Sequence, residues 1–134
     1  MDRADTLIRE SNYVDGAWTG EPSLVVTNKA TGAAMAKVPV MGTKETRAAI
    51  EAAHAALPAW SKKTAKERAA ILRRWFDLMM ANQEDLARLM TIEQGKPLTE
   101  SRGEVAYAAA FLEWFGEEAK RVYGDTIPQH QTDK

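Results

Sequence analysis

The sequence of 134 residues predicts an α+β fold in which short N-terminal β-hairpins are followed by about four helices. Three observations lead to this prediction. An Asp15-Gly16 pair separates two β-prone runs, the hydrophobic period changes to that of a helix at Thr43, and a capping motif follows at Thr64. Since hairpins need a sheet to join and no further strands follow, we expect the chain to be the opening of a longer fold.

Two hairpins are expected in an N-terminal region that spans residues 1–42. In the first hairpin, Asp15 and Gly16 both tolerate the positive φ angles of a type I′ turn. In the second, the β-branched run 24–27 and the apolar positions of 33–40 flank a turn that closes with Gly32. Pro39 limits the last strand to a sheet edge or a strand end, because proline has no N–H group to donate.

Two helices are expected in the first half of a helical region that spans residues 43–124. The first helix starts with Thr43 as its N-cap and is expected to stop at Pro58. The second starts at Thr64, because Thr64 and Glu67 have the spacing of a capping box. Its apolar residues form one broad stripe that we expect to face the core: Ile71, Leu72, Trp75, Leu78 and Met79.

Two more helices complete this region. One spans about residues 84–93, with Gly95 as its left-handed cap. The last and longest spans about 98–123, with Gly124 as its cap, and a polar tail of residues 125–134 follows. Gly103 inside this helix costs about 1 kcal/mol relative to alanine, which suggests a close approach at that point. The expected core face of the last helix is Val105, Ala109, Leu112, Phe115, Ala119 and Val122.

Composition excludes several classes of function. The chain has 45% hydrophobic residues, a net charge of −1 and no cysteine, so a disulfide framework, a thiolate metal site and a thiol nucleophile are excluded. His54 and His130 are too far apart in sequence to suggest zinc.

No leader sequence and no apolar run of about 20 residues is visible, which makes the cytoplasm the expected compartment and a membrane an unexpected partner. The basic cluster in residues 61–74 fits a solvated helix face better than a nucleic-acid surface, because no aromatic residues interleave it.

Chemical motifs are mostly lacking. The eight glycines never form a dinucleotide or phosphate-binding pattern, and no hydrolase or zinc-protease motif occurs. Glu93 is the one unusual carboxylate. It lies just before Gly95 at the negative end of a helix dipole, which is unfavourable unless the carboxylate binds a cation or a donor, and a chance surface position is the alternative.

Three stretches of the chain have the pattern of a known family. Asn28-Lys29-Ala30-Thr31-Gly32 precedes Val38-Pro39, residues 89–98 read LMTIEQGKPL before Glu104-Val105, and residues 111–128 read FLEWFGEEAKRVYGDTIP. These stretches resemble the aldehyde dehydrogenase superfamily, and the last is similar to bacterial NAD(P)+-dependent succinate-semialdehyde dehydrogenases. Lys29 is a departure, because the family pattern has proline there.

The resemblance implies that the chain is the N-terminal part of the α/β aldehyde dehydrogenase fold. Such enzymes oxidise succinate semialdehyde to succinate in 4-aminobutyrate degradation, with a cysteine nucleophile and NAD or NADP as hydride acceptor. The resemblance places the catalytic and cofactor-binding residues beyond residue 134, so none is expected in this chain, which would be an inactive scaffold. The implied partners are the remainder of the polypeptide and further copies in a dimer or tetramer.

Two peripheral sites also follow from the resemblance. Gly103 and Tyr107 map near the wall of the family's substrate tunnel. Glu93 and the backbone carbonyl of Val26 map to a monovalent-cation site. Two alternatives stay open: a stand-alone helical module that binds a partner protein, and part of a dehydrogenase for another semialdehyde.

Overall fold

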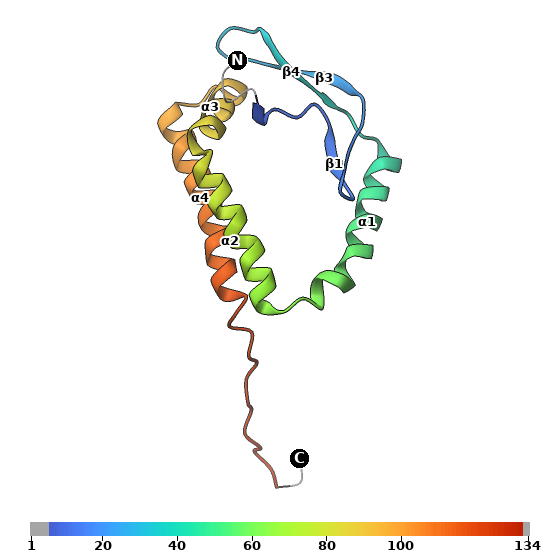
Figure 1. Cartoon of the computed structure of the whole chain (residues 1–134), viewed down its shortest axis with the longest axis vertical. Helices are drawn as coiled ribbons and strands as arrows, with labels where there is room; N and C mark the ends of the chain where they lie inside the picture. Colours follow the sequence, from blue (N-terminus) through green and yellow to red (C-terminus); the bar gives the residue numbers. More distant parts are fainter. Residues whose placement is uncertain (1–5, 133–134) are drawn as a thin grey trace.

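The computed structural model of the chain describes residues 6–132, so the first five residues of the expected hairpin region and the last two of the expected tail lie outside the described residues. Two hairpins come first and four helices follow (Figure 1). Helices α2, α3 and α4 pack together, whereas α1 lies apart from α2 and α4 in the view of Figure 1. The elements are β1 (Asn12–Val14), β2 (Ala17–Thr19), β3 (Pro22–Thr27), β4 (Ala34–Pro39), α1 (Thr43–Ser61), α2 (Ala65–Ala81), α3 (Gln83–Gln94) and α4 (Leu98–Glu118).

The two hairpins form separate two-stranded antiparallel sheets. In β1–β2 the turn residues Asp15 and Gly16 have φ angles of 51° and 77°, as the Asp-Gly signal predicts. In β3–β4, Leu24 lies opposite Val38, and Pro39 pairs at the end of its strand, as expected. Both hairpin predictions are therefore confirmed.

Helix α1 differs from its prediction at both ends. Its N-cap is Gly42 and not Thr43, because the Gly42 N–H donates to Glu45 Oε2 at 3.1 Å. Pro58 does not stop the helix, which continues to Ser61. Because Pro58 lies in the last turn, its missing N–H removes only one bond near the end, and its carbonyl still accepts from Lys62 N–H at 3.3 Å.

The capping signals of α2 and α3 are confirmed. Thr64 Oγ1 accepts from Glu67 N–H at 3.3 Å, and Glu67 Oε2 accepts from Thr64 N–H at 2.7 Å, which is the reciprocal capping box. Helix α3 ends at Gly95, whose φ of 81° is in the left-handed region.

Helix α4 ends at Glu118, five residues earlier than predicted, and Gly124 is not its cap. At its C-terminal end Gly116 is buried against Ala69 and Leu72 in the first turns of α2, so further turns of α4 would extend beyond the helix that supports it. Val122 and Tyr123 are accordingly 81% and 84% exposed. Among residues 6–132 no helix is both long and apolar enough to span a membrane.

The core of the described residues consists of small side chains. A seam between α4 and its two neighbours buries Ala69 of α2, Ala87 of α3, and Ser101, Val105, Ala109 and Gly116 of α4. The apolar faces predicted for α2 and α4 are therefore only partly buried. Leu72, Met79 and Leu112 are half-buried, but Ile71, Trp75, Leu78, Phe115 and Val122 are exposed, because the helices approach through their small residues.

Polar contacts join the helices around this seam. The hydroxyls of Thr91 and the fully buried Ser101 lie 2.9 Å apart and connect α3 to α4. Arg102 donates to both carboxylate oxygens of Glu84 at 2.7 and 2.8 Å. Arg73 of α2 reaches Glu113 of α4 at 3.1 Å.

The capping box predicts an acid-sensitive α2. Hydrogen bonds from the Thr64 hydroxyl and the Thr64 backbone N–H lower the pKa of Glu67. Because the folded-state pKa is below the unfolded one, the cap stabilises α2 fully above the unfolded value and loses its effect as the pH falls through the folded value. We expect helix content, measured by far-ultraviolet circular dichroism, to fall below about pH 4, and Glu67→Gln to reduce this fall. The control is Glu51→Gln on α1, and an identical acid titration of the two variants would contradict the prediction.

Candidate functional site

The β3–β4 turn, which follows Val26, meets the C-terminal end of α3, which carries Glu93. The Lys29 N–H donates to Ile92 O at 3.0 Å, so Glu93 follows a residue that is bonded to this turn. A Cβ atom at Gly95 would lie only 3.1 Å from Lys29 Cβ, and the positive φ already requires glycine there. The left-handed cap therefore lets the turn approach the helix end closely.

The β3–β4 turn is held by its own hydrogen bonds. Asn28 Oδ1 accepts from the N–H groups of Ala30 and Thr31 at 2.9 and 3.3 Å, as in an Asx turn. The Asn28 carbonyl accepts from Gly32 N–H at 2.8 Å, and Lys29 Nζ donates to Thr27 Oγ1 at 3.4 Å. These bonds fix the backbone immediately after Val26.

The junction by itself supplies few metal ligands. Glu93 is exposed and Val26 is half-buried. No group of three or more His, Cys, Asp or Glu residues within residues 6–132 is arranged to hold a metal ion. A cation bound between a carboxylate and one backbone carbonyl would need further oxygen ligands from water or from other polypeptide.

Gly103 and Tyr107 lie one turn apart on the exposed side of α4, away from Ser101, Val105 and Ala109 in the seam. A Cβ atom at Gly103 would meet nothing within 4 Å. The close approach that the sequence suggested at Gly103 is therefore not made by the residues that the structure describes.

The same side of α4 continues into aromatic side chains that the sequence analysis did not single out as a group. The rings of Tyr107 and Phe111 meet edge to face with centroids 5.0 Å apart, and those of Phe111 and Phe115 stack at 6.4 Å. With Ala110 and Trp114 they line an open groove of about 340 Å³. The spacing of four between Tyr107, Phe111 and Phe115 was the signal in the sequence that could have identified this surface.

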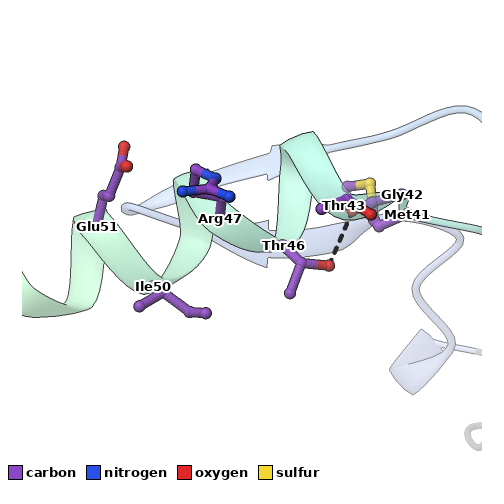
Figure 2. A pocket seen from close by; sticks show the side chains of 7 residues that line it. All are labelled: Met41, Gly42, Thr43, Thr46, Arg47, Ile50 and Glu51. Atoms are coloured by element: carbon purple, nitrogen blue, oxygen red, sulfur yellow. Dashed lines mark hydrogen bonds between the residues drawn. The ribbon is translucent and has the colours of Figure 1, made fainter.

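Two further pockets, one along α1 and one between α2 and α4, are lined by residues that already take part in hydrogen bonds or ion pairs within the chain. One hollow, of about 750 Å³, follows the first turns of α1, with Arg47 and Glu51 on one side of the helix and Thr46 and Ile50 on the other (Figure 2). Thr46 Oγ1 donates to Gly42 O at 2.9 Å, and Glu45 caps the helix, so its N-terminal groups are partly satisfied within the chain. A second hollow between α2 and α4 contains the Arg73–Glu113 ion pair.

The remaining pKa shifts also belong to a structural contact. Hydrogen bonding to the Arg102 guanidinium lowers the pKa of Glu84, and the same contact raises the pKa of Arg102. Both groups join α3 to α4 and neither lies among the sequence-predicted site residues. This pair supports packing of the helices and does not indicate an acid–base catalyst.

Comparison with known proteins shows which longer proteins the chain resembles. A family model described as "Aldehyde dehydrogenase family" matches residues 18–134. The chain is 67% identical over 131 residues to a glutarate-semialdehyde dehydrogenase of Pseudomonas aeruginosa, which covers 96% of the chain and 27% of the relative. It is 61% identical over 132 residues to an NADP(+) succinate-semialdehyde dehydrogenase of Escherichia coli, with the same two coverages. The chain thus spans about a quarter of the length of the curated relatives it matches.

Solved structures share the fold as well as the sequence. An Escherichia coli NADP-dependent enzyme aligns with a TM-score of 0.89 and 59% identity over 96% of this chain and 27% of its own. A Staphylococcus aureus betaine aldehyde dehydrogenase in complex with NAD+ aligns with a TM-score of 0.87 and 25% identity over 98% of this chain and 27% of its own. The hairpins and helices described above are therefore common to longer chains of diverged sequence.

Proposed function

The chain belongs to the aldehyde dehydrogenase family, and we propose that it forms the N-terminal segment of an NAD(P)+-dependent enzyme that oxidises succinate semialdehyde to succinate. Its fold is the corresponding part of the aldehyde dehydrogenase fold, as the resemblance implied. The observation that carries the proposal is the 61% identity to a succinate-semialdehyde dehydrogenase over 96% of the chain.

Glutarate semialdehyde is the second candidate substrate. Two Pseudomonas glutarate-semialdehyde dehydrogenases are 67% and 63% identical to the chain, slightly more than the succinate-semialdehyde enzyme. Both substrates have an aldehyde at one end and a carboxylate at the other. The proposed substrate class is therefore the semialdehyde of a dicarboxylic acid.

The residues of this chain do not fit a nicotinamide cofactor or a covalent aldehyde intermediate. The chain has no cysteine, and its glycines do not form a loop that would cradle a pyrophosphate. We therefore propose a scaffold role for this segment, with the nucleophile and the cofactor site contributed by further polypeptide. Assembly into a homo-oligomer and a cytoplasmic location belong to the same proposal.

The first test of this function compares residues 1–134 alone with the complete product of the reading frame that encodes them. We expect the complete product to reduce NAD or NADP with succinate or glutarate semialdehyde, and the ratio of kcat/KM values to identify its substrate. Residues 1–134 alone are expected to be inactive, because they lack a thiol. Cofactor reduction that scales with the 134-residue chain would contradict the scaffold role. A stop codon directly after residue 134 would favour the stand-alone interaction module instead.

We further propose that Gly103 and Tyr107 form part of the wall of the substrate tunnel. The support is that Gly103 is exposed and a side chain there would meet no other described residue. In the complete enzyme, Gly103→Val is expected to raise KM for the semialdehyde about tenfold, or about 1.4 kcal/mol, without lowering the thermal midpoint. The control is Ala108→Val, an exposed position on a different side of α4. Equal KM values for the two variants would contradict the tunnel assignment.

Glu93 and the Val26 carbonyl are proposed to hold a monovalent cation in the complete enzyme. The support is the Lys29–Ile92 hydrogen bond, which brings the two segments together, and the exposed carboxylate at the negative end of α3. Glu93→Gln is expected to remove at least about half of the rise in Tm that potassium gives over choline at equal ionic strength. Glu100→Gln, another exposed acid, serves as the control. An unchanged potassium response in Glu93→Gln would favour a simple surface position.

A further inference from the structure

We propose that the Asp15–Gly16 pair, at the tip of the β1–β2 hairpin, is a site of spontaneous covalent modification, at which aspartate is converted to isoaspartate. Among the aspartates of the sequence, Asp15 alone is followed by glycine. The conversion starts when the next amide nitrogen attacks the aspartate carboxyl, and glycine has no side chain that would hinder this approach. The site is independent of the activity proposed above.

The reaction needs only the two residues and water. The Gly16 nitrogen bonds to Asp15 Cγ, and the hydroxyl of the carboxyl group leaves with the proton of the nitrogen as water, which closes a five-membered succinimide ring. One water molecule then opens the ring. Addition at Cγ restores aspartate, whereas addition at the main-chain carbonyl breaks its bond to Gly16 and leaves Gly16 joined through Cγ. The product has the same mass, one more carbon in the main chain and a free carboxylate at the former main-chain carbonyl.

The structure leaves this pair accessible. Both residues are exposed, and the Asp15 carboxylate has no hydrogen-bond or ion-pair partner within residues 6–132. The two flanking strands are three residues long and pair only with each other within that range. A two-stranded hairpin of this size is marginally stable by itself, so it can open while the helices stay folded.

Opening of the turn is a required step. The φ angles of 51° and 77° are those of a type I′ turn, in which the Gly16 nitrogen points away from the Asp15 side chain. Packing against α1 opposes the opening only weakly, because the hairpin tip and four alanines of α1 line a hollow of about 370 Å³. Tyr13 and Trp18 contact each other with centroids 5.0 Å apart, yet they remain 62% and 55% exposed.

The modified hairpin cannot close again in its original register. Two residues join Val14 to Ala17, and the twist of a type I′ turn matches its strands only at this length. An added main-chain carbon removes that match, so the Val14–Ala17 pair and the Tyr13–Trp18 contact are lost together. The change is confined to the hairpin, because the seam between α2, α3 and α4 uses none of these residues.

The test incubates the complete product of the reading frame that encodes residues 1–134 at neutral pH and measures isoaspartate by electron-transfer fragmentation, which distinguishes the two isomers of equal mass. Asp125, which is exposed, outside any helix and followed by Thr126, is the internal control. Gly16→Asn is the matched variant, because asparagine tolerates a positive φ but adds a side chain. We expect isoaspartate to form at least about tenfold faster at position 15 than at position 125, and at least about fivefold more slowly at position 15 in Gly16→Asn.

A peptide of residues 10–20 gives the rate for a pair that no fold protects. We expect the rate in the folded protein to lie within about a thousandfold of the peptide rate, because global unfolding is too rare to permit this. A larger reduction would show that the turn does not open locally and would overturn the proposal. Equal rates at positions 15 and 125, or an unchanged rate in Gly16→Asn, would overturn it as well. Isoaspartate at position 15 in a product without dehydrogenase activity would support the site and count only against the proposed function.

Discussion

The close packing of small side chains between α4 and its neighbours is the constraint on which the rest of the structure depends. At Gly116 a Cβ atom would lie 3.5 Å from Leu72 Cβ and 3.7 Å from Ala69 O, so α2 and α4 approach almost backbone to backbone there. Ala109 and Ala87 are completely buried, and Ser101 keeps its hydroxyl in the seam only because Thr91 is its partner. Once small residues form the contact, the large ones on both helices must face outward. The seam therefore determines the core and also the surfaces available for function.

This constraint explains where the sequence predicted the structure and where it did not. Local signals succeeded, because the Asp15-Gly16 turn, the Thr64–Glu67 box and the Gly95 cap each depend only on contacts and conformations within a few residues of the chain. The core face of α4 was predicted only in part, because apolar residues surround this helix and periodicity alone does not choose among its sides. Val105 and Ala109 are buried as predicted, but Phe115 and Val122 are exposed, and the fully buried Ser101 was not expected in the core.

The ends of the helices depend on the same tertiary information. Pro58 is a strong stop signal on its own, yet it is tolerated because α1 ends one turn later and loses only one bond. Gly124 is a good cap in isolation and has a positive φ of 72°, but α4 ends before it, where α2 no longer provides support. In both cases the sequence identified a residue with the right conformation. It could not show how much of the helix a neighbour would cover.

The candidate cation junction follows from how the β3–β4 hairpin is joined to the helices. The hydrogen bond from Lys29 N–H to Ile92 O connects the hairpin to the helices, and a proline at position 29, as in the family pattern, could not donate it. The backbone link at the junction therefore requires a residue other than proline at position 29, and it lies directly beside Glu93. Around α4 the situation is the reverse, because polar links and small residues hold the inner side and aromatic rings remain on the outer side. Gly103 and Tyr107, the residues proposed for the tunnel wall, lie at the start of that outer side, so the seam of small residues that packs one side of α4 also leaves the opposite side exposed in the described residues.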